Sequence, residues 1–474
     1  MTGKRQSLWI KLSSAYLPFS DVATVDLPLT RLLRLALFQV SVGMAAVLLT
    51  GTLNRVMIVE LNIPAWVVAV MVSIPLLAAP LRAFIGHKSD QHRSLLGWRR
   101  VPYIWAGTLL QFGGFAIMPF ALLIMSGDTT GSPVVGIVAA TLAFVLVGLG
   151  MHMTQTAGLA LATDLASEES RPRVVALLYV MLLLGMLGSS IIIGLLLSDF
   201  SAIRLVQVIQ GVAAVTMVLN LIALWKQEGR NKALTSAPKV TPPFREVWRS
   251  FSSQPQVFRL LIALGLGTAA FSMQDVLLEP FGGQVLGLSV GQTTGLTALW
   301  SLGALFGFAL AARRLALEAD PIRLAGMGAV AGVFAFAIVV WSAAAVSPFI
   351  FCFGVGLIGF GTGVFSVSML ISAMALGSKG EAGLALGAWG AVQATATGVA
   401  AALGGAVRDG VGSVAMRGGL GEALVSPATG YSFVYHFEIM LLFATMIALG
   451  PLARRVSTGS SQSASTFGLS DFPT

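Results

Sequence analysis

The chain has 474 residues, of which 56% are hydrophobic and only 10% are charged, and its mean hydropathy is +0.86. A soluble domain carries about 25% charged residues, so this composition excludes a soluble globular protein and predicts a bundle of membrane-spanning helices. The net charge of +9 would suit nucleic-acid binding, but the basic residues group between apolar runs, which indicates membrane topology instead.

Residues 1–31 precede the first apolar run and form a predicted cytoplasmic or interfacial leader. Its apolar residues, among them Trp9 and Phe19, stand beside Lys4 and Lys11, which predicts a segment lying on the membrane surface. The first apolar run starts about 30 residues into the chain and is long, which indicates an uncleaved span rather than a cleavable signal peptide.

Twelve apolar runs are long enough to cross a bilayer as helices, for which about 20 residues are needed. We predict spans at 32–57, 64–86, 101–125, 134–160, 172–197, 204–225, 258–280, 291–312, 322–344, 349–375, 383–407 and 431–452. The polar, proline-containing stretch at 226–257 divides them into two sets of six. The predicted organisation is therefore a leader (1–31), an N-terminal half (32–225), a central cytoplasmic linker (226–257), a C-terminal half (258–452) and a disordered tail (453–474).

The distribution of basic residues predicts the sidedness of this bundle. With the N-terminus in the cytoplasm, all 29 Lys and Arg residues except Arg55, Arg204, Arg408 and Arg417 fall in cytoplasmic segments. The positive-inside rule therefore places both termini in the cytoplasm. The single cysteine, Cys352, lies inside an apolar run, so no intrachain disulfide is predicted.

Charged residues near the ends of the first and seventh spans form the first candidate site. Arg55 lies about 23 residues into the first span and so near the outer surface. Asp275 and Glu279 lie one turn apart on one face of the seventh span. Because these spans are equivalent in a 6+6 bundle, we predict that Arg55 pairs with Asp275 or Glu279 as a periplasmic gate. The alternative is independent contacts with water or lipid headgroups.

The loop after the second span is dense in cations and cannot lie in hydrocarbon. Its pattern resembles the loop between helices 2 and 3 of the major facilitator superfamily. That resemblance implies that the Asp caps a neighbouring helix end and that the Arg residues latch the two halves together on the cytoplasmic side. The residues that carry the pattern are Gly86, Asp90, Arg93, Gly97, Arg99 and Arg100.

His152 is an ionisable residue within the fourth span, with Gln155 and Thr156 on the same helix face. Ionisable groups at membrane depth are expensive and usually functional. A neutral imidazole can ligate the magnesium of a chlorophyll-type ring, which makes His152 and Gln155 candidate pigment-binding residues. The alternative is a histidine hydrogen-bonded to a neighbouring helix.

Glycines at helical spacing form small-residue faces, for which helix packing is the predicted role. The alternative is a flat groove that admits a planar ring or a partner helix. A dinucleotide-like Gly pattern at 354–359 has no preceding strand and is assigned to packing. The four His and one Cys are scattered, so we expect neither a metal site nor an enzyme. The packing glycines are Gly359 and Gly363 in the tenth span and Gly383 and Gly387 in the eleventh.

Four segments resemble the PucC/LhaA family, the bacteriochlorophyll-delivery branch of the major facilitator fold. They begin at Leu33, Ala79, Ala162 and Gln274, and the resemblance extends over residues 30–452. The most specific motif is the run QDVLLEPFGG at 274–283. The resemblance implies an all-α integral membrane protein with twelve transmembrane helices in a 6+6 bundle.

The resemblance also implies an assembly factor for light-harvesting antenna in the inner, intracytoplasmic membrane of purple bacteria. Such a protein binds or delivers bacteriochlorophyll to antenna polypeptides and chaperones their oligomerisation. General similarity favours the LhaA branch, which serves the core antenna around the reaction centre. The implied partners are the antenna alpha and beta polypeptides, the reaction-centre/core-antenna complex, the bacteriochlorophyll synthase and membrane lipids, and no nucleic acid.

A secondary active transporter that moves a small amphiphilic molecule by alternating access is the alternative function. A proton-coupled pump needs a titratable carboxylate near the bilayer midplane. Asp275 and Glu279 are predicted to lie too near one surface for that role. The residues therefore favour assembly over pumping.

Overall fold

The computed structural model describes residues 28–77, 98–127, 132–167, 170–229, 255–376 and 382–456. The first half of the chain contains α2 (Leu29–Ala46), η2 (Val47–Leu53), η3 (Val56–Glu60), α3 (Ala65–Leu77), α5 (Val101–Met125), α6 (Pro133–Leu165), α7 (Arg171–Leu196) and α8 (Ala202–Leu224). The second half contains α11 (Pro255–Ser272), η4 (Met273–Val276), α12 (Leu278–Gln284), α13 (Val290–Ala316), α14 (Pro321–Ala344), α15 (Pro348–Leu376), α16 (Ala382–Met416), η5 (Glu422–Leu424) and α17 (Ala428–Val456).

The prediction of an all-α membrane protein is confirmed. Within the described ranges, 11 helices are long and apolar enough to cross a membrane. The predicted second span is represented by α3, and the rest of 64–86 lies outside the described residues, as do the leader to residue 27, most of the linker and the tail from residue 457. The predicted domain boundaries and the sidedness of the termini stay predictions.

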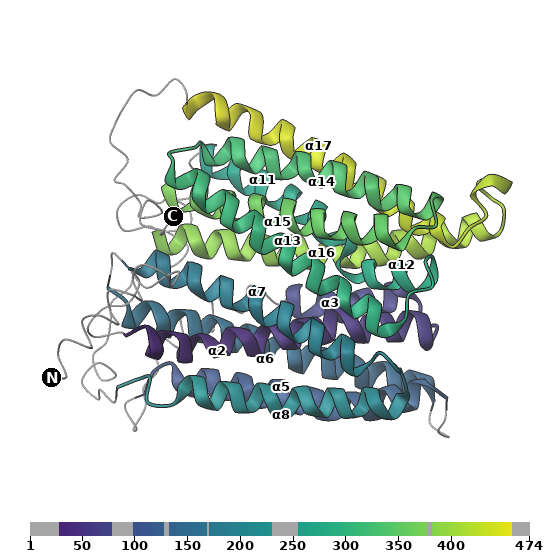
Figure 1. Ribbon diagram of the computed structural model, residues 1–474, viewed down its shortest axis with the longest axis horizontal. Helices are drawn as coiled ribbons and strands as arrows, with labels where there is room; N and C mark the ends of the chain where they lie inside the picture. Colours follow the sequence, from purple (N-terminus) through teal and green to yellow (C-terminus); the bar gives the residue numbers. More distant parts are fainter. Residues whose placement is uncertain are drawn as a thin grey trace.

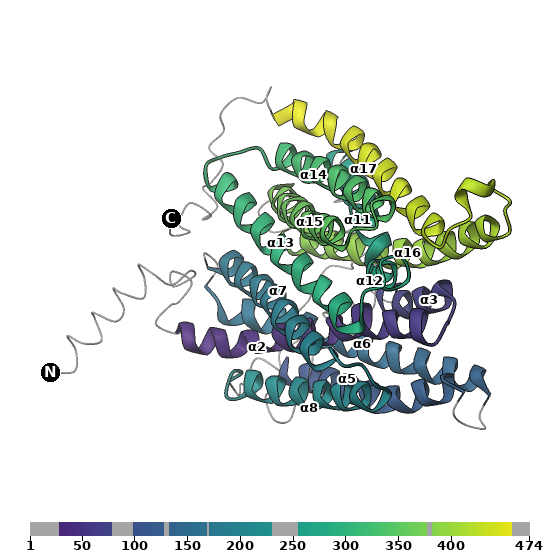
Figure 2. The same cartoon turned by 45° about the vertical axis from the view of Figure 1, so that its right-hand side comes forward.

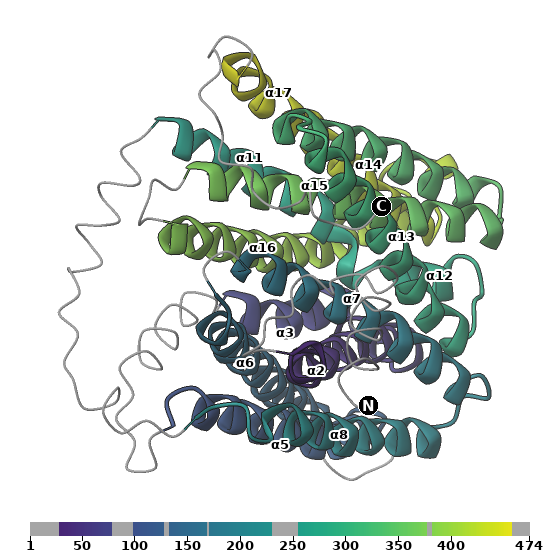
Figure 3. The same cartoon turned by 60° about the vertical axis from the view of Figure 1, so that its left-hand side comes forward.

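The two halves of the chain lie side by side (Figure 1), with the first half below the second in that view. Their most extensive contacts are between α7 and α13 and between α3 and α16 (Figure 2), and η2 and η3 of the first span also touch the second half. One continuous apolar core runs through both halves. Viewed from the side (Figure 3), α2, α3 and α6 of the first half face α11, α15 and α16 of the second. We call the end where α2 begins and α17 ends the terminal end, and the opposite end the far end.

The first and seventh spans are not regular α-helices. The first changes to wider π-helical turns in η2 and η3, and the seventh changes to a 3₁₀ turn in η4 between α11 and α12. Pro280 explains the second change, because it has no N–H and its ring clashes with the carbonyl four residues earlier, which belongs to Val276. The predicted span at 258–280 is therefore broken, and irregular backbone at membrane depth is tolerated only inside protein.

The eleventh span is longer than predicted. Its helix α16 continues to Met416, whereas the sequence placed the end of the span at 407. The prediction stopped at the first charged residues, Arg408 and Asp409, but a helix need not end where it leaves hydrocarbon. Its last turns carry both residues to the far end, where they meet the start of α3.

Candidate functional site

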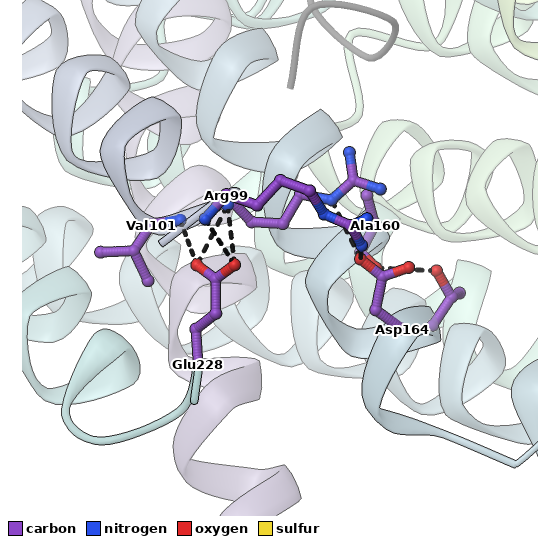
Figure 4. A network of polar contacts seen from close by, with 7 residues as sticks. Arg99, Val101, Ala160, Asp164 and Glu228 are labelled. Atoms are coloured by element: carbon purple, nitrogen blue, oxygen red, sulfur yellow. Dashed lines mark hydrogen bonds and ion pairs between the residues drawn. The ribbon is translucent and has the colours of Figure 1, made fainter. Parts of the chain in front are cut away.

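Two carboxylates hold the terminal end of the first half together (Figure 4). Glu228, which follows α8, accepts hydrogen bonds from the backbone N–H groups of Arg99, Arg100 and Val101 at the start of α5, over 2.7–3.1 Å. Asp164 near the end of α6 accepts one from Arg99 Nη2 at 2.7 Å and one from Arg100 Nε at 3.0 Å. Glu228 thus satisfies N–H groups that have no partner inside their helix and meets the positive end of the helix dipole.

A third contact joins the start of α2 to the same end. Arg31 Nη2 donates to the backbone carbonyl of Gln227 at 2.6 Å, and Gln227 Nε2 donates to the carbonyl of Arg31 at 3.1 Å. We define the terminal latch as Arg31, Arg99, Arg100, Asp164, Gln227 and Glu228. These contacts lie within the first half, whereas the resemblance implied that Arg99 and Arg100 clamp the two halves. The predicted latch residues Gly86, Asp90 and Arg93 lie outside the described residues.

Arg55 lies where the first span meets the seventh, but its ion pair is local. Its Nη1 donates to Glu60 Oε1, and its Nη2 donates across the halves to the carbonyl oxygen of Leu288 at 3.1 Å. The guanidinium lies over Gly283, since a Cβ added there would come within 3.0 Å of Nη2. Arg55 therefore touches the second half through backbone, and its part in a gate stays a prediction.

Glu279 is the predicted gate carboxylate that comes nearest to the first span. It is buried, its Oε1 accepts a hydrogen bond from Thr297 Oγ1 at 2.7 Å, and it lies directly over Gly51 of η2. A side chain at Gly51 would occupy the space of the Glu279 carboxylate. Among the hydrogen bonds of the described residues, the partner of Glu279 is Thr297 and that of the Asp275 side chain is Gln274, rather than Arg55.

Arg55→Ala is expected to lower the free energy of unfolding by about 2 kcal/mol, because it leaves the Leu288 carbonyl without a charged donor. Glu60→Ala is expected to cost less than about 1 kcal/mol, because the Glu60 side chain is 39% exposed while that of Arg55 is 5% exposed. Denaturant titration in detergent micelles measures both. Equal losses in the two variants would mean that the ion pair, and not the contact with Leu288, is the stabilising element.

A buried polar cluster surrounds the break in the seventh span. The backbone N–H of Gln274 donates to Glu438 Oε1 on α17 at 2.7 Å, and its side-chain Nε2 donates to Asp275 Oδ1 at 2.6 Å and to the Phe271 carbonyl at 3.1 Å. Asn54 Nδ2 of the first span reaches the carbonyl oxygen of Asp275 at 3.5 Å. The break therefore releases backbone groups that side chains from three spans take up.

Glu438 was not predicted as a site residue, although it is one of the most buried ionisable groups of the described chain. It is 0% exposed, its Oε2 has no hydrogen-bond partner, and Tyr435 one turn earlier is also fully buried. From the sequence, Asp275 and Glu279 were considered as carboxylates for a proton-coupled pump, and Glu438 was left out. The signal was present in the sequence, because Glu438 stands in the apolar run of the last span, where a carboxylate is a functional hypothesis by default.

A groove of about 590 Å³ opens at the far end next to this cluster. Arg408 lies in it, and its guanidinium contacts Asp409, Gln284 and the ring of Tyr431, whose hydroxyl donates to Gln284 Oε1 at 2.7 Å. Asp409 in turn accepts the backbone N–H of Trp66 at 2.8 Å, which ties α16 to the start of α3. The groove is thus framed by both halves. Its lining is Pro64, Trp66, Gln284, Arg408, Asp409, Gly412, Ser413, Met416, Ser426 and Pro427.

The candidate pigment residues lie on α6 in the first half. His152 and Gln155 are both partly buried, and Gln155 Nε2 points to Gln39 Oε1 of α2 at 3.4 Å. His152 is more than 100 residues along the chain from the buried polar cluster at the break in the seventh span. Pigment ligation by His152 stays a prediction.

The glycines singled out in the tenth span lie against α13. A Cβ at Gly359 would overlap the carbonyl oxygen of Trp300, and one at Gly363 would overlap that of Ala304. Because these glycines have no side chain, the backbones of α13 and α15 can pack in direct contact. Gly383 and Gly387 lie in α16, in a stretch whose side-chain surroundings are outside the described part.

Comparison with known proteins identifies the family of the chain. A family model described as PUCC protein matches residues 52–457. The chain is 57% identical, over 84% of its length and 88% of the relative's, to "Protein PucC" of Rhodovulum sulfidophilum. It is 54% identical, over 98% of both chains, to an "Uncharacterized protein in puhA-bchM intergenic region" of Rhodobacter capsulatus.

Among solved structures, a bacterial homologue of the human lysosomal transporter Spinster, in an inward-facing and unoccupied conformation, has a similar fold. The TM-score is 0.68 over 92% of this chain and 98% of that chain, at 15% sequence identity. At that identity the likeness shows the fold alone. The prediction of a major-facilitator-like bundle is confirmed.

Proposed function

The chain belongs to the PUCC protein family, and from that membership we propose that it is an assembly factor for a purple-bacterial light-harvesting antenna. In this proposal it binds or delivers bacteriochlorophyll to the antenna alpha and beta polypeptides and chaperones their oligomerisation, for the core antenna around the reaction centre. The observation that carries the proposal is similarity over 84–94% of the chain, at 50–57% identity, to proteins named PucC.

The outward-facing side chains of the structure support a role in handling apolar molecules. Several aromatic side chains of the second half project outward from the bundle, among them Phe306 on α13, Trp341 on α14 and Phe349 on α15. In a membrane these faces contact lipid, antenna helices or pigment.

His152 is our candidate ligand for the bacteriochlorophyll magnesium, with Gln155 beside it. A neutral imidazole nitrogen supplies the axial bond that such a ring accepts, and partial burial on α6 keeps the nitrogen away from bulk water. We place the protein in the inner, intracytoplasmic membrane with both termini in the cytoplasm, because the positive-inside rule assigns 25 of the 29 Lys and Arg residues of the sequence to that side. The reaction-centre complex and the bacteriochlorophyll synthase are the further partners that we propose.

Gentle purification from the native membrane tests the assembly function, with an absorption spectrum, pigment extraction and mass spectrometry of the copurifying polypeptides. We expect bacteriochlorophyll together with antenna or reaction-centre polypeptides. His152→Ala is expected to lower the pigment content at least severalfold. His436→Ala is the matched control, because His436 is exposed on α17 and bonds only to its own helix among the described contacts.

A colourless preparation without partners would contradict the assembly function and favour the transporter. One observation supports that second candidate. The hydrogen bonds that join the two halves lie towards the far end, as would be expected of a gate that is closed there: Thr52 with Thr294, Asn54 with Asp275, Arg55 with Leu288, Trp66 with Asp409 and Ser190 with Thr294. Uptake of amphiphiles into vesicles that contain the purified protein measures transport directly.

A further inference from the structure

We propose that the break in the seventh span is a proton-binding site, that Glu438 is its acceptor, and that the bound proton favours the closed far end. This inference rests on the buried cluster and does not depend on the proposed assembly function. It gives a role to the buried Glu438 carboxylate, which forms no ion pair among the described residues.

The first ground is the set of unsatisfied buried oxygen atoms at the break. Glu438 Oε1 accepts the Gln274 N–H at 2.7 Å, but Glu438 Oε2 has no partner. Gln274 Oε1 and the Tyr435 hydroxyl are buried and unpartnered as well. Unsatisfied buried polar groups are rare because they lose their hydrogen bonds to water without replacement. A proton on Glu438 removes the charge of this carboxylate and turns Oε2 from an acceptor alone into a group that can also donate.

The second ground is the balance of charge. Asp275, which directly follows the Gln274 whose N–H Glu438 accepts, is itself a carboxylate. Arg408 on α16 is bound to Asp409, Gln284 and Tyr431, and Arg55 is bound to Glu60 and to the Leu288 carbonyl. An ionised Glu438 would therefore be a buried charge beside a like charge, without a cation on it. Protonation removes that cost.

A proton fits this site better than a metal ion. The described residues contain no cluster of three or more metal-binding side chains, and hard cations take about six oxygen ligands. Tyr431 and Tyr435, on the same helix as Glu438, pack on Phe281 through edge-to-face contacts, so aromatic rings rather than oxygen ligands occupy this part of the interior. The described surroundings of Glu438 therefore offer a proton acceptor but not the ligand set of a metal ion.

The third ground is the path from Glu438 to the closed far end. Glu438 holds the Gln274 backbone, Gln274 holds the Asp275 side chain, and the Asp275 carbonyl receives Asn54 from the first span. A negative charge on Glu438 would favour arrangements that bring it to water, which requires this packing to open. The proton thus binds the closed arrangement more tightly than the open one, and that difference is what shifts the population.

Infrared difference spectroscopy of the purified protein tests proton binding directly. At neutral pH we expect the carbonyl-stretch band of a protonated carboxylic acid, and we expect Glu438→Gln to remove it. Gln keeps an acceptor for the Gln274 N–H, so the variant is expected to fold. Glu60→Gln is the matched control, because Glu60 is partly exposed and ion-paired. If the band persists in Glu438→Gln, or is absent from the natural protein, Glu438 does not hold the proton.

Spin-label distances across the far end test the coupling. Labels at Asp199 and Glu422, exposed positions in the two halves, are introduced into the Cys352→Ser protein. From about pH 5 to about pH 9 we expect the natural Glu438 protein to shift towards longer distances, and Glu438→Gln to keep the short distance throughout. Tyr435→Phe is expected to move the midpoint of the shift. Distances that do not change with pH, or that change equally in Glu438→Gln, would overturn the coupling.

Discussion

Gly359→Ala is expected to lower the free energy of unfolding by about 3 kcal/mol, the largest effect that we predict for a single methyl group in this protein. The added Cβ would overlap the carbonyl oxygen of Trp300 on α13. Because the obstacle is backbone and not the end of a flexible side chain, no change of rotamer relieves it. The two helices must move apart, which also opens the neighbouring contact of Gly363 with Ala304.

Gly356→Ala on the same helix is the matched control. The nearest atom to its added Cβ is the Leu299 carbonyl oxygen at 3.9 Å, an ordinary van der Waals contact. Alanine is favoured over glycine inside a helix by about 1 kcal/mol, so this variant is expected to be as stable as the natural protein or slightly more stable. Denaturant titration of both variants in the same micelles gives the comparison. Equal stability of the two variants would show that α13 and α15 are not held at backbone contact.

Glu228→Ala is expected to cost about 2 kcal/mol and to loosen the start of α5. One carboxylate accepts the N–H groups of Arg99, Arg100 and Val101, and removing it leaves all three to water or to nothing. The effect is expected to exceed that of an ordinary capping residue, because the acceptor is charged and serves three donors. Hydrogen exchange at the first turn of α5 is expected to rise together with the loss of global stability.

Glu422→Ala is the control for Glu228→Ala, because it removes a carboxylate that accepts no described hydrogen bond from a helix start. Glu422 is exposed at the start of η5 and has no side-chain contact among the described ones, so a change within about 0.5 kcal/mol is expected. Glu228→Gln keeps one acceptor oxygen, so its loss of stability is expected to lie between those of Glu228→Ala and Glu422→Ala. If Glu228→Ala exchanges at the start of α5 no faster than Glu422→Ala does, the cap contributes nothing to the stability of that helix.

The sequence predicted the close packing of the tenth span through its glycines, but it did not predict the cap that Glu228 forms at the start of α5. The small-residue face of the tenth span was visible because glycines at 359 and 363 recur at helical spacing. The cap by Glu228 was not visible, because 127–129 residues separate it from the N–H groups that it binds. Nothing in the local composition of either segment identifies the other as its partner.

The residues near the break in the seventh span were also predicted only in part. Asp275 and Glu279 were singled out because charges are rare in an apolar run, whereas the break before Pro280 was not predicted and the span was drawn without interruption over 258–280. The partner of Arg55 depended on the path of the helix: its wider π-turns bring Glu60, five residues along, to the guanidinium. The predicted pairing with the seventh span rested on the depth of Arg55 in the first span and on the equivalence of the two spans in a 6+6 bundle, and it assumed regular helices.

The sequence by itself determined the class of fold and the approximate limits of most spans, because burial of apolar length is a local and additive property of the chain. Only the tertiary structure decided which polar groups meet. Glu438 reaches the Gln274 N–H because α17 packs against the broken seventh span, and Arg99 and Arg100 meet Asp164 because α5 packs against α6. Hydrogen bonds depend on distances of a few tenths of an ångström between distant segments, and only the packing of the helices sets those distances.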